Sequence, residues 1–191
     1  MKSHLLFCLF LSIFTAKLTF ADKKNSSNFE FKIAFGSCGK QTHPLPIFDE
    51  VIKQDPNIFI FLGDNIYGDT NDMDILRKKY QELGNKESYK NLIKNTDVLA
   101  TWDDHDYGQN DAGKHYPHKE ESKEIFLEFF KEPKNSERYK HRGIYHSVYK
   151  KAGNKIIQII LLDNRTFRDD LVRFPKGQKI PGRFFYRPDY L

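Results

Sequence analysis

Two short acidic stretches each follow an apolar run and hold residues that could carry chemistry. The first is FIFLGDNIYGDT at residues 59–70, and the second is TWDDHDYGQND at residues 101–111. Asp64 lies in the first stretch, and Asp104 and His105 lie in the second. Carboxylates crowded in this way repel one another unless a positive charge lies among them, so the pattern favours a bound cation.

A third candidate position is Cys38, in the sequence FGSCGK at the end of an earlier apolar run, and Tyr67 follows Asp64 by three residues. Ligands in open α/β sheets bind outside the carboxyl ends of the strands. We therefore expect Cys38, Asp64, Tyr67, Asp104 and His105 to converge. A thiolate and a phenolate beside carboxylates suit Fe(III) or zinc, whereas carboxylates and amides alone suit Ca²⁺, Mg²⁺ or Mn²⁺.

Each of these residues also has an ordinary structural interpretation. Asp64 could cap a turn, Cys38 could be a small buried apolar residue, and Tyr67 could simply pack. The DDHD sequence could form an exposed acidic loop. The metal site is favoured because metal-compatible groups follow all three expected strands.

The elements that would position these residues can be read from hydrophobic periodicity. We expect strands at residues 29–37, 57–64 and 97–106, helices at 46–54, 72–84, 86–94 and 119–133, and a strand pair at 143–150 and 155–165 with a Gly-Asn turn. Helices that alternate with strands predict an α/β fold, here with a mixed sheet.

The bulk composition limits the class of protein. The chain has 191 residues, enough for about one domain, and a formal net charge of +5. The basic residues are scattered and form no block with interleaved aromatics, so we expect no nucleic-acid-binding patch.

The first 21 residues resemble a secretory signal peptide, with the apolar run LLFCLFLSIF and a cleavage site after Ala21. The alternative is a membrane anchor, but the run is short and Lys17 interrupts its end, so we expect no stable anchor. The mature chain, 22–191, would be secreted or periplasmic. Cleavage removes one of the two cysteines and leaves Cys38 without an internal disulfide partner.

Several motifs, taken in order, resemble the PhoD-like alkaline phosphatases of the calcineurin-like metallophosphoesterase superfamily. They are FGSC, FLGDNIYGD, LATWDDHDYGQNDAG, FLEFF, GIYHS and IILLDNRTFRDDL, between about residues 30 and 175. The resemblance implies a sandwich of two mixed sheets flanked by helices.

The resemblance also implies roles for individual residues. Tyr67 takes the second ligand position of the Gly-Asp-x-x-Asp motif, as in purple acid phosphatases, which favours Fe(III) together with Ca²⁺, with Mn²⁺ or Zn²⁺ as alternatives. His105 would be catalytic, and Arg165 and Arg168 would bind the substrate phosphate or else form surface salt bridges. The implied metal ligands are Cys38, Asp64, Tyr67, Asp104 and Asn110.

The implied activity is hydrolysis of phosphate esters by metal-activated water, on a small-molecule, lipid or polymer substrate. The superfamily takes further histidine ligands from the second half of its domain, and this sequence has no histidine after His146. We therefore expect residues 22–191 to be the N-terminal part of an incomplete domain whose C-terminal half is missing, with weak activity or none. The alternatives are a truncated, non-catalytic remnant with a partial metal site and an exported adhesion module.

Overall fold

The computed structural model describes residues 30–171. The expected signal peptide at residues 1–21 and the tail at 172–191 lie outside the described residues. Within the described range, no helix is both long and apolar enough to cross a membrane.

A parallel sheet of three strands forms the centre of the fold, in the order β1-β2-β3. Its strands are β1 (Ile33–Gly36), β2 (Ile58–Phe61) and β3 (Asp97–Ala100). Every residue of β2 is buried, as the continuous apolar run predicts for a strand covered on both faces. Phe59 and Phe61 point into one hydrophobic cluster, and Ile58 and Ile60 point into another.

Helices cover the face of the sheet that carries Phe59 and Phe61. They are α1 (Ile47–Lys53), α2 (Met73–Gly84), α3 (Glu87–Asn95) and α5 (Lys119–Phe129). Phe48 of α1 makes edge-to-face contacts with both phenylalanines, at 5.9 and 5.7 Å between ring centroids. Aromatic packing of this kind makes the helix side the larger core.

The strand pair packs on the opposite face as a separate antiparallel sheet, formed by β4 (His146–Ala152) and β5 (Lys155–Leu161). Gly153 in the turn has φ 62°, which glycine adopts without strain, so the expected Gly-Asn turn is confirmed. Ile159 and Leu161 pack against Ile58 and Ile60. The α/β class is confirmed: among the described residues one sheet is parallel and the other antiparallel.

Two short helices were not expected from the sequence, α4 (Asp104–Tyr107) and α6 (Glu137–Lys140). The third strand was predicted to reach residue 106, but it ends at Ala100. The backbone N–H of Asp103 donates to Asp106 Oδ2 at 3.0 Å, and this local bond competes with strand geometry. The acids therefore lie on a helical turn beyond the strand.

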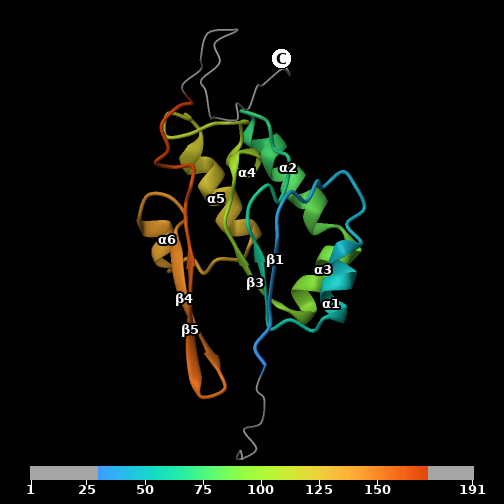
Figure 1. The fold of residues 1–191 in the computed structure, drawn as a ribbon. Helices are drawn as coiled ribbons and strands as arrows, with labels where there is room; N and C mark the ends of the chain where they lie inside the picture. Colours follow the sequence, from blue (N-terminus) through green and yellow to red (C-terminus); the bar gives the residue numbers. More distant parts are fainter. Residues whose placement is uncertain (1–29, 172–191) are drawn as a thin grey trace, which may run out of the picture.

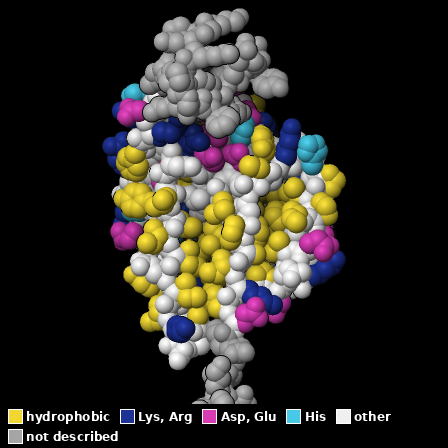
Figure 2. All heavy atoms as spheres, in the orientation of Figure 1, with side chains coloured by type: hydrophobic (Ala, Val, Ile, Leu, Met, Phe, Trp, Pro, Cys, Tyr) yellow, Lys and Arg dark blue, Asp and Glu magenta, His cyan; other side chains and the backbone are white. Residues whose placement is uncertain are grey.

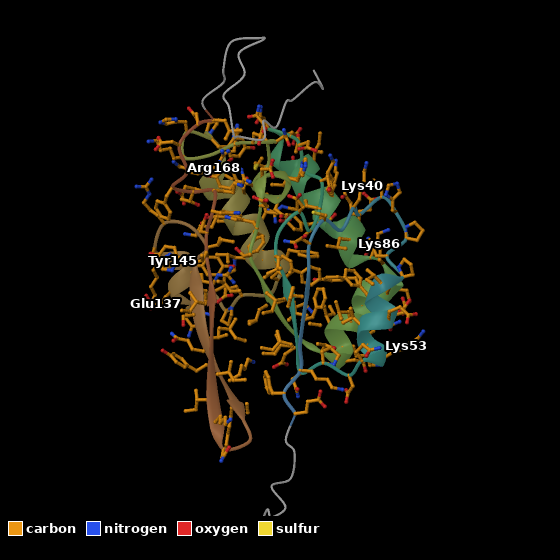
Figure 3. All side chains as sticks on the ribbon, viewed as in Figure 1. Lys40, Lys53, Lys86, Glu137, Tyr145 and Arg168 are labelled. Carbon is orange, nitrogen blue, oxygen red and sulfur yellow. The ribbon has the colours of Figure 1, made fainter. Side chains whose placement is uncertain are left out.

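The carboxyl ends of the parallel strands lie at the upper end of Figure 1, beside α4, whereas the chain enters β1 from the opposite end. Arg168, in the segment after β5, also lies toward the upper end, and Lys53 at the end of α1 lies toward the lower end (Figure 3). Residues far apart in the sequence therefore meet at the upper end.

Candidate metal centre

The loops that follow β2 and β3 approach closely because of Gly63. This residue has φ 111°, and a Cβ atom there would lie 2.7 Å from Asp103 Cβ and 2.8 Å from Asp103 N. Only glycine fits both the conformation and the space. The close approach brings Asp64, the next residue, beside Asp104 and His105.

Asp64, Asp104 and His105 form a compact group of potential metal ligands. One carboxylate oxygen from each aspartate and one ring nitrogen of His105 all lie within 4.8 Å of one another. Asp104 is buried, and the other two residues are half-buried. Figure 2 shows acidic side chains and a histidine gathered at the upper end of the molecule.

Asp64 has an oxygen that the protein leaves unsatisfied. Its Oδ1 atom is buried and has no hydrogen-bond partner among the described residues. Burial, with repulsion from Asp104 and Asp103, raises the pKa of Asp64 above its usual value, although His105 acts in the opposite direction. A cation would satisfy this oxygen and offset the repulsion, so the residues present fit a bound metal.

His105 is held by the carboxylate of Asp69, to which the sequence motifs assigned no role. Its Nδ1 atom lies 2.6 Å from Asp69 Oδ1. Burial lowers the pKa of His105, but the hydrogen bond to Asp69 and the charges of Asp69, Asp64 and Asp104 outweigh it, so the pKa is raised. The ring of Tyr67 packs against the imidazole, with centroids 4.2 Å apart.

Cys38 lies at the edge of the group. Its Sγ atom is 3.7 Å from Asp64 Oδ2, and the residue is exposed. Cys38, Asp64 and Asp69 all adopt positive φ angles, of 61°, 49° and 44°. Such angles cost free energy in residues other than glycine and cluster at functional sites. Hydrogen bonds from the backbone of residues 38 and 39 to the loop after β2 hold this conformation.

Tyr67 is positioned by Gln41, a residue that no sequence motif indicated. The buried Gln41 side chain accepts from Tyr67 N at 2.8 Å and donates to Tyr67 O at 3.4 Å. Burial, together with the nearby Cys38 and Asp64, raises the pKa of the Tyr67 phenol above its usual value. A phenolate at this position would therefore need a cation beside it.

The other expected site residues are engaged with neighbours. Asn110 donates to Asp111 Oδ2 at 3.3 Å, and Asp111 N donates to Asp104 Oδ2 at 2.7 Å. Arg165 pairs with Asp103 and lies 3.6 Å from Asp104 Oδ1. Arg168 donates to the backbone carbonyls of Asp111 and Ala112. Both arginines thus hold the loops of the site, and phosphate binding by them stays a prediction.

Asp106 is a fully buried acid within the candidate site. Burial raises its pKa to about 7, against the backbone N–H donors of Asp103, Asn65 and Ile66, which lower it. The sequence alone did not distinguish Asp106 from the exposed acids. The available signal was a further acid two residues after Asp104 in the DDHD sequence.

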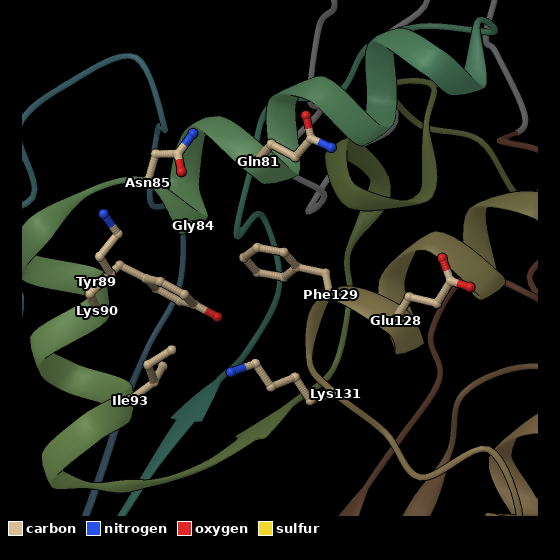
Figure 4. A pocket seen from close by; sticks show the side chains of 9 residues that line it. All are labelled: Gln81, Gly84, Asn85, Tyr89, Lys90, Ile93, Glu128, Phe129 and Lys131. Carbon is tan, nitrogen blue, oxygen red and sulfur yellow. The ribbon is translucent and has the colours of Figure 1, made fainter.

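A groove of about 570 Å³ lies away from these residues, among the ends of α2, α3 and α5 (Figure 4). Its lining includes Tyr89, Phe129, Lys90 and Lys131, and none of the candidate ligands. The lining offers no convergent set of metal or phosphate ligands, so the strand ends remain the candidate site.

Comparison with known proteins supports the fold. No protein-family model matches the sequence, and no curated protein matches it either. A solved structure of PhoD superposes with a TM-score of 0.60 at 19% sequence identity, over 73% of this chain. The chain has a PhoD-like fold. It spans 32% of the length of that PhoD chain.

Proposed function

We propose that this protein is an exported, metal-dependent phosphoesterase. The observation that carries the proposal is the buried, unpartnered Oδ1 atom of Asp64 within a group of three potential ligands. The PhoD-like fold adds support, since the motifs of the sequence also resemble those of the PhoD-like alkaline phosphatases. Export rests on the apolar N-terminal run LLFCLFLSIF and the expected cleavage site after Ala21.

The residues that would hold the metal are Asp64 and Asp104, with Cys38 and Tyr67 beside them. A thiol and a phenol next to carboxylates favour Fe(III), and the carboxylates favour Ca²⁺ as its companion, with Mn²⁺ or Zn²⁺ as alternatives. When bound, such ions polarise phosphoryl oxygens and lower the pKa of water.

His105 would act as a general acid toward the leaving-group oxygen of the ester. The Asp69 carboxylate occupies Nδ1, which leaves Nε2 to carry the transferred proton. The hydrogen bond to the Asp69 carboxylate stabilises the protonated imidazole that a general acid needs. Arg165, already 3.6 Å from Asp104, would meet the phosphate with its planar guanidinium.

A second candidate function is metal binding without hydrolysis. It is favoured by the compact group itself, in which Asp64, Asp104 and His105 are three potential ligands, so that His105 would bind the metal instead of donating a proton. Catalysis requires several ligands that act as a unit.

An assay after loading with Fe(III), Ca²⁺, Mn²⁺ or Zn²⁺ separates the two functions. We expect metal binding in the wild type and its loss in Asp64→Asn. Asp55→Asn is the matched control, because Asp55 has a similar φ of 50° and precedes β2 at the opposite end of the sheet.

Turnover of a chromogenic phosphomonoester or diester that depends on Asp64 supports the phosphoesterase, and about 1 s⁻¹ lies within the ordinary enzyme range. Metal binding without turnover supports the second function. Equal metal binding by wild type and Asp64→Asn would contradict both.

A further inference from the structure

Asp106 bridges the two loops that carry the candidate ligands. Its Oδ1 atom accepts from the backbone N–H groups of Asn65 at 2.9 Å and Ile66 at 3.2 Å, directly after Asp64. Its Oδ2 atom accepts from Asp103 N at 3.0 Å, directly before Asp104. The Asp106 side chain therefore holds both loops with one group.

The remaining surroundings of Asp106 explain why the bridge is rigid. The residue has no exposed surface, and the phenol of Tyr80, on α2, also donates to Oδ1 at 3.2 Å. A carboxylate fixed by four donors inside the core has little freedom to move. Any displacement of Asp106 would therefore move one loop relative to the other.

We propose that Asp106 is a positioning residue that sets the spacing between Asp64 on one loop and Asp104 and His105 on the other. The inference rests on the proposed metal site, since spacing matters only if these groups bind together. Ligands that act on one ion must be held at a fixed separation, and supporting hydrogen bonds provide this. Among the described residues, the hydrogen bonds of the Asp106 side chain go to backbone N–H groups and to Tyr80, and none goes to a ligand side chain.

The chemistry of the carboxylate gives the proposal a specific test. Both oxygens of an ionised carboxylate accept hydrogen bonds, whereas an amide has one accepting oxygen and one donating nitrogen. In Asp106→Asn, the oxygen can accept from Asn65 and Ile66 or from Asp103, and the NH₂ group then faces a donor on the other loop. The substitution keeps the shape and releases one loop only.

We expect two results from Asp106→Asn. Mn²⁺ affinity, measured by electron paramagnetic resonance, falls about tenfold or more, as it does when groups that support a ligand are lost. Hydrogen exchange without metal becomes faster at Asp103, or at Asn65 and Ile66, but not at both. Tyr80→Phe removes one donor, leaves both loops held and should change neither measurement.

Leu92→Ala controls for loss of stability, because Leu92 is fully buried on α3 outside the bridge. A fall in Mn²⁺ affinity no larger than that of Leu92→Ala would overturn the proposal. So would faster exchange throughout the core instead of at one loop. If Asp106→Asn does not fold, rapid exchange of the Asn65, Ile66 and Asp103 amides in the wild type overturns it, and slow exchange supports it.

The outcomes also separate this proposal from the function on which it rests. No binding of Fe(III), Ca²⁺, Mn²⁺ or Zn²⁺ by the wild type would overturn the phosphoesterase and, with it, the positioning of metal ligands. Unchanged Mn²⁺ affinity in a folded Asp106→Asn protein would overturn the positioning role alone.

Discussion

The ring of Tyr67 packs against the imidazole of His105, and Cys38 lies close enough to affect the pKa of its phenol. Its phenol becomes a useful ligand only when a cation favours the ionised form, because burial and the Cys38 and Asp64 groups raise its pKa. Fe(III) binds phenolates strongly, and the resulting complex absorbs visible light.

We predict that Fe(III)-loaded wild-type protein shows a visible charge-transfer band and that Tyr67→Phe lacks it. Tyr149→Phe is the control, since Tyr149 is 66% exposed on β4 and should leave the band unchanged. Absorption spectroscopy checks this. A colourless Fe(III)-loaded wild type would count against phenolate ligation.

Asp69 controls the charge of His105 in the metal-free protein. The hydrogen bond and the negative charge of Asp69 both raise the pKa of His105, so Asp69→Asn should lower it. A smaller fraction of the imidazole is then protonated at pH 7. An NMR titration of the ring nitrogens measures the shift, with Asp55→Asn as the control. An unchanged or higher pKa of His105 in Asp69→Asn would show that the hydrogen bond to Asp69 does not raise the pKa of the imidazole.

Arg138 connects helix α6 to strand β3 and to the segment before β4. It lies on α6 with 3% of its surface exposed, and it donates to Ile144 O before β4 and to Ala100 O of β3. It also pairs with Glu132 at 3.0 Å. Burial lowers the pKa of Arg138, although Glu132 opposes the shift.

Arg138→Met should lower the free energy of unfolding by about 3–5 kcal/mol, because Glu132 and two carbonyls lose their partner. Urea denaturation measures the loss. Arg77→Met is the control, since the Arg77–Glu128 pair is well exposed and should be worth less than about 1 kcal/mol. A loss for Arg138→Met no greater than for Arg77→Met would contradict the prediction.

The molecule as a whole exposes apolar side chains on its sheets. Ile156 and Ile160 are 74% and 62% exposed on the face of β5 that points away from Ile159 and Leu161. Leu162, directly after β5, is 71% exposed, and Phe35 of β1 is 68% exposed. Figure 2 shows hydrophobic side chains spread over the middle of one face. Faces of this kind promote association.

We predict that this chain self-associates as its concentration rises and that the double substitution Ile156→Lys, Ile160→Lys shifts it toward monomer. Sedimentation velocity measures the distribution. Ile47→Lys is the control, because Ile47 is 59% exposed on α1, outside the sheets. An equal shift with Ile47→Lys would mean that general charge, and not this face, controls association.

The sequence by itself determined the α/β class, the order of the main elements and the positions of Asp64, Asp104 and His105 after strands. These features follow from local periodicity and from polar residues at strand ends. It also predicted that Cys38 and Tyr67 would lie nearby, and the contacts of Cys38 with Asp64 and of Tyr67 with His105 agree.

Only the tertiary structure decided which groups hold the site in place. Asp69 and His105 are 36 residues apart in sequence, Gln41 and Tyr67 are 26 apart, and Asn65 and Asp106 are 41 apart. No local pattern encodes such partners, because a hydrogen bond depends on where folded loops meet. The position of the β4–β5 sheet also depends on tertiary packing, because Ile159 and Leu161 pack against Ile58 and Ile60 of β2.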